Sequence, residues 1–165
     1  MDADIPLILI GGQGLKIERP QISVKKKRTD AMTYKVTKCI DFCYGHRLLN
    51  YDGKCRHLHG HNGRVEIEVS GEALDGRGML TDFGDIKRLV KSWIDEHLDH
   101  RMILHREDPA LPFIQQCGEP HYVIDENPTA EAIARLIYQK SHELGLPVSA
   151  VILWETPDSF AAFRG

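Results

Sequence analysis

The chain reads Cys55-Arg56-His57-Leu58-His59-Gly60-His61 and, two residues later, Arg64-Val65-Glu66-Ile67-Glu68-Val69. The second part alternates polar and apolar residues, which predicts a half-buried β-strand. Residues two apart in a strand share a face, so a strand that begins early enough turns His59 and His61 to the side of Val65. Gly60 between them has no side chain to crowd a ligand. A hydrated surface pair of histidines has the same spacing, so the spacing alone leaves metal binding and solvent exposure open.

A third histidine, His46, ends an earlier predicted strand that covers residues 32–46. Ile40 and Phe42 alternate on one side of that strand, and His46 has the same parity. Two neighbouring strands can therefore bring three imidazoles around one point. Three protein ligands with an open position are typical of catalytic zinc, whereas closed four-ligand sites are structural. Cys55 is either a fourth, structural ligand or a free thiolate beside the metal.

Composition excludes several classes of function. With 21 basic and 24 acidic residues, the net charge is -3, which does not suggest a general nucleic-acid or membrane surface. The four cysteines lack zinc-ribbon spacing, and we find no secretory signal, so we expect a reduced, cytoplasmic protein. No apolar run approaches the roughly 20 residues that span a bilayer. We therefore expect partners that are neither nucleic acids nor membranes.

Residues 1–31 differ from the rest of the chain. A glycine-rich turn, residues 11–14, follows a short apolar run, but no helical period comes after it, which argues against a phosphate-binding loop. We expect this segment to be a flexible or loosely docked extension. Residues 32–165 are long enough for one domain with its own core.

The remaining periodicity predicts an α+β fold. Helices are expected from Thr81 or Asp82 to about Asp99, with Phe83, Ile86, Val90, Trp93 and His97 buried, and from an Asn127 cap to Leu144. Further strands are expected at 61–72, 148–155 and 160–164, while 104–125 is irregular apart from a possible short strand at 121–124. Consecutive strands with short connections pair antiparallel. The prediction is a four-stranded antiparallel sheet with two helices packed on one face.

Five motifs occur in an order that resembles the family of 6-pyruvoyl-tetrahydropterin and 6-carboxy-tetrahydropterin synthases. They are Cys-x-x-x-His-Gly-His at 55–61, Met79-Leu80-Thr81-Asp82-Phe83, Leu98-Asp99-His100, Asn127-Pro128-Thr129-Ala130-Glu131 and Trp154-Glu155-Thr156. The resemblance covers residues 32–165. It implies the tunnelling fold (T-fold), in which subunits assemble as a homohexamer of two trimers with active sites between subunits. It also implies a small-molecule substrate, 7,8-dihydroneopterin triphosphate.

The residues and the resemblance together give a set of expected roles. His46, His59 and His61 are expected to hold Zn²⁺, and Cys55 to act as a catalytic thiolate. The second proton-handling pair is Asp99 and His100. The resemblance implies that Glu155 anchors the pterin ring, with Thr129 as its neighbour.

The expected reaction is that of a lyase which forms 6-carboxy-tetrahydropterin on the way to queuosine. The three residues between Cys55 and His59 resemble the carboxy type, because the pyruvoyl type has a longer gap. Two alternatives stay open: a 6-pyruvoyl-tetrahydropterin synthase, which only eliminates triphosphate, and a non-catalytic zinc-binding module of the same fold.

Overall fold

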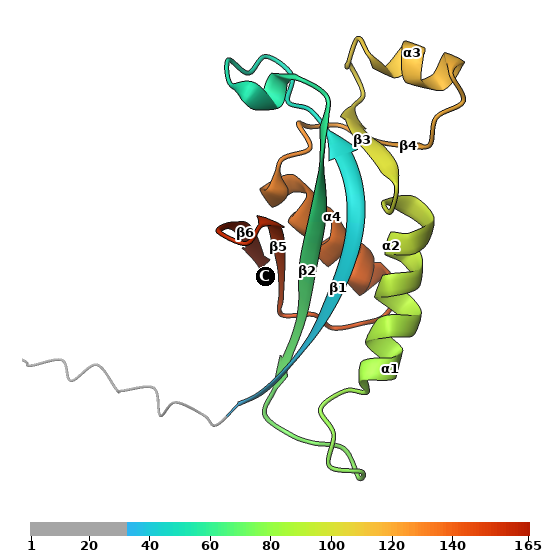
Figure 1. Ribbon diagram of the computed structural model, residues 1–165. Helices are drawn as coiled ribbons and strands as arrows, with labels where there is room; N and C mark the ends of the chain where they lie inside the picture. The colour runs from blue at the N-terminus through green and yellow to red at the C-terminus, as the bar shows by residue number, and fades with distance from the viewer. Residues whose placement is uncertain (1–32) are drawn as a thin grey trace, which may run out of the picture. The chain divides into compact units, whose positions relative to one another are not determined.

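Two long strands form the centre of the sheet in the computed structural model, which describes residues 33–165 (Figure 1). β1 (Tyr34–His46) and β2 (His59–Gly71) pair antiparallel over their whole length, with His46 opposite His59. β2 thus begins two residues before the predicted 61–72, which puts His59 in the strand, as the shared face of His59 and His61 requires. The predictions for residues 1–31 lie outside the described residues.

The sheet has six strands in the order β4-β3-β1-β2-β5-β6, so the predicted four-stranded antiparallel sheet is wrong. β5 (Ala150–Thr156) and β6 (Ser159–Arg164) extend it antiparallel from β2, as expected. On the other side, β3 (Arg101–His105) lies parallel to β1, and β4 (His121–Ile124) lies parallel to β3. The helical segment between β2 and β3 supplies the crossover that a parallel pair needs.

The first helical segment is continuous but not uniform. It consists of α1 (Phe83–Ile86), the π-helical η2 (Lys87–Lys91) and α2 (Ser92–His97), and the Asp82 side chain caps it by accepting from the Gly84 amide. The wider π turn changes which residues face inward. After this turn Ile94 and Leu98 are fully buried, and Trp93 and His97, predicted on the buried face, are only partly buried. Phe83, also predicted to be buried, precedes the π turn and is 51% exposed.

The second long helix, α4 (Ala130–Glu143), begins later than predicted because Thr129, rather than Asn127, is its cap. The Thr129 hydroxyl accepts from the Ala132 amide, and the Asn127 side chain instead pairs with the backbone of Leu49. At the other end, Gly145 has a positive φ of 84°. The amides of Gly145 and the next residue bond back to the last turn, which is the Schellman arrangement favoured by glycine.

The main core lies between one face of the sheet and both helical segments, as predicted for two helices on one face. Its fully buried members include Val65 and Ile67 from β2, Ile86 and Ile94 from the first helical segment, and Ile133 from α4. A short third helix, α3 (Leu111–Gln116), lies between β3 and β4 in the segment predicted to be irregular. Leu104, Leu111 and Ile114 form a small second core there. Among residues 33–165, no helix is long and apolar enough to cross a bilayer.

Candidate metal centre and adjoining cavity

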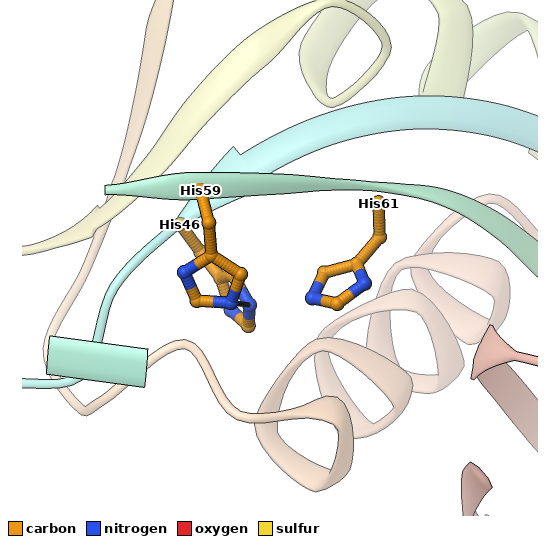
Figure 2. A group of neighbouring side chains, drawn as sticks. All are labelled: His46, His59 and His61. Atoms are coloured by element: carbon orange, nitrogen blue, oxygen red, sulfur yellow. Dashed lines mark hydrogen bonds between the residues drawn. The ribbon is translucent and has the colours of Figure 1, made fainter. Parts of the chain in front are cut away.

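The three predicted metal ligands meet at the end of the β1–β2 pair. His46 is the last residue of β1, and His59 and His61 are the first and third residues of β2. All three side chains lie on the core face of the sheet. Their ring centroids are 4.5 to 5.1 Å apart, and one nitrogen from each ring lies within 4.8 Å of the others. Figure 2 shows the rings turned toward one another on one side of the two strands.

Hydrogen bonds fix the tautomers of two of these rings. His46 Nδ1 lies 2.6 Å from the Pro128 carbonyl oxygen, and His59 Nδ1 lies 2.7 Å from the His57 carbonyl oxygen. A carbonyl oxygen only accepts, so each Nδ1 carries the hydrogen and each Nε2 presents a lone pair in the neutral ring. This backbone orientation of the outer nitrogen is typical of metal-ligating histidines.

The inner nitrogens have no satisfactory partner without a cation. His46 Nε2 and His59 Nε2 are 3.0 Å apart, so two lone pairs face each other. His61 Nε2 is buried and has no hydrogen-bond partner among the described residues. An unpaired buried nitrogen is costly, whereas a cation bound between the three nitrogens would satisfy all of them. The donor set therefore fits a metal ion that accepts imidazole ligands, such as zinc.

Burial keeps His46 in the form that binds metal. His46 is 2% exposed, and this burial lowers its pKa, against the opposing effects of the Pro128 carbonyl and the Glu155 charge. The charges of the neighbouring His59 and His61 lower it further. A neutral imidazole is the ligand form, so the environment favours coordination near neutral pH.

Glu155, the predicted pterin anchor, lies next to the histidines. From β5 its Oε1 accepts a 3.1 Å hydrogen bond from the Tyr44 hydroxyl and lies 3.7 Å from His46 Nε2. Burial, followed by the Glu155 charge and hydrogen bond, raises the pKa of Tyr44, so the phenol stays a donor. The Glu155 side chain is 23% exposed and lines a cavity of about 1060 Å³ together with His61 and His100.

The predicted proton-handling pair lines the same cavity. His100 Nδ1 lies 3.0 Å from Asp99 Oδ2, and Asp99 Oδ1 accepts from the Cys43 amide at 2.8 Å. Burial would raise the pKa of Asp99, but the Cys43 amide and the His100 ring together hold it below its usual value. Two adjacent helical residues cannot face each other. Here they can, because His100 lies beyond the helix with a positive φ of 54° and donates its amide to the Cys43 carbonyl.

Two predicted residues lie apart from this group. Cys55 belongs to the short 3-10 helix η1 (Lys54–Arg56) in the β1–β2 loop, and its ligand atom is outside the three-histidine group found within residues 33–165. The loop is fixed by a bond from the Leu48 amide to the Cys55 carbonyl and by the Asn127–Leu49 pair. Thr129 caps α4, so its oxygen already accepts a hydrogen bond while its hydroxyl hydrogen is left to donate.

Sequence reasoning missed Cys43 and Asn62. They are cross-strand partners on β1 and β2, and the Cys43 thiol donates to Asn62 Oδ1 at 3.1 Å. Both line the cavity that contains Glu155 and His100. Strand parity alone places Cys43 on the face opposite His46, so this part of its position could have been predicted from the sequence. Its approach to Asp99 depends on the turn after α2, which periodicity does not reveal.

Comparison with known proteins agrees with the motifs. The family model of 6-pyruvoyl tetrahydropterin synthase matches residues 35–165. The chain is 41% identical over 133 residues to a protein of Rickettsia conorii named 6-carboxy-5,6,7,8-tetrahydropterin synthase, covering 76% of this chain and 96% of that protein. A Haemophilus influenzae protein of the same name is 34% identical, with 79% and 99% covered.

Solved structures share the fold of this chain. An uncharacterised protein from Wolinella succinogenes superposes with a TM-score of 0.69 at 31% identity, covering 81% of this chain and 99% of that one. The 6-pyruvoyl tetrahydropterin synthase of Caenorhabditis elegans, 22% identical, superposes with a TM-score of 0.62 over 81% and 96% of the two chains, and supports the fold. The chain thus belongs to the 6-pyruvoyl tetrahydropterin synthase family, and the prediction that it is an enzyme of that family is confirmed.

Proposed function

We propose that the protein is a zinc-dependent lyase that converts 7,8-dihydroneopterin triphosphate to 6-carboxy-5,6,7,8-tetrahydropterin, with release of acetaldehyde and triphosphate, in queuosine precursor biosynthesis. The observation that carries the proposal is the convergence of three inward-facing imidazole nitrogens beside a cavity lined by Glu155, Asp99 and His100. This combines ligands for a Lewis acid, a proton-transfer pair and a carboxylate on one small-molecule site.

In this proposal His46, His59 and His61 hold Zn²⁺, which supplies a Lewis acid for a side-chain oxygen of the substrate. Cys55 Sγ, as a thiolate, removes a proton from the substrate carbon next to that oxygen. His100 exchanges the complementary proton through Nε2, because Asp99 engages its Nδ1. Asp99 orients the ring and favours its protonated form.

Glu155 is proposed to bind the pterin ring. A pterin edge carries an amino group and a ring N–H side by side, which a carboxylate matches with two charge-assisted hydrogen bonds. Tyr44 donates to one oxygen and thereby fixes the carboxylate at the rim of the apolar face. Thr129 is proposed as a second contact through its remaining hydroxyl hydrogen.

The choice of the carboxy product rests on two supports. Three residues separate Cys55 from His59, and the curated relatives described above are named 6-carboxy-tetrahydropterin synthases. The experiment is incubation of the zinc-loaded protein with 7,8-dihydroneopterin triphosphate. We expect acetaldehyde and 6-carboxy-tetrahydropterin in equal amounts. Accumulation of 6-pyruvoyl-tetrahydropterin without acetaldehyde would assign the alternative activity, and no turnover at full zinc occupancy would favour the non-catalytic module.

We also propose a cytoplasmic homohexamer built from two trimers. Among residues 33–165, β4 and β6 are the two edges of the sheet, and the backbone groups along a sheet edge suit edge-to-edge assembly. All four cysteines are free thiols, which suits a reducing compartment. Light scattering of the purified protein tests the assembly: a mass near six chains is expected, and a stable monomer would contradict it.

A further inference from the structure

A second group of metal-ligating side chains lies beside β1, where Cys43 projects from the face opposite His46. Cys43 Sγ and one ligand atom each from Asp99 and His100 lie within 4.8 Å of one another. The group is distinct from the three-histidine centre in composition, because it adds a thiol and a carboxylate to one imidazole. Only one of its three members is an acid, so it is not merely a patch of surface carboxylates.

Backbone contacts hold the three side chains together from both sides. The Cys43 amide donates to Asp99 Oδ1, and the His100 amide donates to the Cys43 carbonyl at 2.6 Å. These bonds fix the end of α2 against β1, so the ligand atoms converge before any ligand arrives. Pre-organisation of this kind lowers the entropy lost when an ion binds.

We propose that Cys43, Asp99 and His100 form a second, weaker site for a thiophilic divalent cation such as Zn²⁺, and that filling it inhibits the enzyme. Thiolate and imidazole ligands select zinc and its neighbours over Mg²⁺ or Ca²⁺. The inhibitory part rests on the proposed function, since it assumes that Asp99 and His100 transfer protons. The binding part does not.

The geometry suits zinc with little movement. Zinc–nitrogen and zinc–oxygen bonds of about 2.0–2.2 Å at a tetrahedral angle separate the two ligand atoms by roughly 3.3–3.5 Å. His100 Nδ1 and Asp99 Oδ2 are 3.0 Å apart, so they open by only a few tenths of an ångström. The Cys43 sulfur lies within 4.8 Å of a ligand atom of each of these residues, and His100, whose side chain is 77% exposed, is free to rotate toward it.

The cation competes directly with the hydrogen on His100 Nδ1 that faces Asp99. His100 Nδ1 lies 3.0 Å from Asp99 Oδ2, which leaves room for one hydrogen between the two atoms. An ion bound to both atoms occupies that place and withdraws the lone pair of Nδ1. The neutral ring then carries its hydrogen on Nε2, which can no longer accept a proton from the substrate, and Asp99 no longer favours the charged imidazole. Excess zinc is therefore expected to reduce turnover without displacing metal from the three-histidine centre.

Titration of metal-free protein with Co²⁺ tests the site. Cobalt bound by histidines alone lacks the near-ultraviolet charge-transfer band that a cobalt–thiolate bond produces. We expect no band with the first equivalent and a band with the second. Cys43→Ser should abolish the band, and Cys39→Ser, an exposed cysteine on the same face of β1, should retain it. In wild-type protein, excess Zn²⁺ should also protect Cys43 from alkylation, as mapped by mass spectrometry.

Turnover at increasing free Zn²⁺, normalised to the activity of each variant, then tests the inhibition. Loss of the thiolate should shift the inhibitory concentration upward by at least about tenfold in Cys43→Ser. The site would be overturned if a second equivalent of Co²⁺ bound without producing the band. It would also be overturned if the band persisted unchanged in Cys43→Ser and Zn²⁺ did not protect Cys43 from alkylation in the wild-type protein. A band with the first equivalent that vanishes in Cys55→Ser would instead contradict the three-ligand centre, and so tests the proposed function separately.

Discussion

The ion pair between Arg47 and Asp108 gives the sharpest prediction about how the chain is held in place just after His46. Arg47 directly follows His46, and Asp108 belongs to the segment that leads into α3. Two guanidinium nitrogens of Arg47 donate to the two oxygens of Asp108, one of them at 2.8 Å, and the Ala110 amide donates at 2.7 Å. The Asp108 side chain is fully buried, whereas Arg47 is 21% exposed.

Arg47→Ala removes the cation and leaves a buried carboxylate with one donor. Breaking a buried pair from one side costs about 3–5 kcal/mol, and partial hydration through the space left by Arg47 places the expected loss near the lower end, at about 3 kcal/mol. For a chain of this size that corresponds to a fall in Tm of roughly 10 °C. Urea denaturation and calorimetry measure both quantities.

The matched control is Arg106→Ala. Arg106 also pairs with an aspartate, Asp125, in the same part of the chain, but both side chains are exposed to solvent. Exposed pairs contribute little to stability, so this substitution should change the free energy of unfolding far less. An Arg47→Ala variant no less stable than Arg106→Ala would refute the reasoning from burial.

The same pair predicts a pH dependence. Burial would raise the pKa of Asp108, but Arg47 and the Ala110 amide hold it below its usual value in the folded protein. A lowered folded-state pKa stabilises the protein above the unfolded-state value of about 3.9, and this stabilisation is lost as the pH falls through the folded-state pKa. In Arg47→Ala the carboxylate lacks its cation and protonates more readily. The difference between the two proteins should therefore be largest at neutral pH and shrink in acid.

Three further substitutions separate the proposed roles in the site. Cys55→Ala should keep zinc near one ion per chain while turnover collapses, and metal loss measured by atomic emission would instead make Cys55 a ligand. His100→Ala should slow steady-state turnover on the order of a hundredfold. A near-normal rate would mean that His100 has no role in proton transfer. Glu155→Gln should weaken pterin binding, measured by calorimetry, by roughly ten- to a hundredfold, with unchanged zinc. Binding as tight as in the parent would mean that the ring is held elsewhere.

Strand parity was enough to predict that the three histidines share one region. Polar and apolar residues alternate with a period of two, so the sequence places His46, His59 and His61 on the faces that carry Phe42 and Val65. The β1–β2 register then brings His46 opposite His59. These predictions depend only on local pattern and on the pairing of consecutive strands.

The parallel half of the sheet could not be predicted in the same way. β3 has five residues and β4 has four, too few to show a period, and neither pairs with its neighbour in sequence by a hairpin. Their place depends on the positive φ of His100 and on the bond from its amide to the Cys43 carbonyl. The approach of Cys43 to Asp99 has the same tertiary origin.

The metal content of a His61→Asn variant tests the three-histidine centre most directly. His61 Nε2 is buried without a hydrogen-bond partner among the described residues, so the account gives it no role except as a ligand. His57→Asn is the matched control, because only the backbone carbonyl of His57 contacts the His59 ring. We predict about one tightly bound zinc per chain in the parent and in His57→Asn, and loss of most zinc and activity together in His61→Asn. Full zinc occupancy in His61→Asn would contradict the centre proposed here.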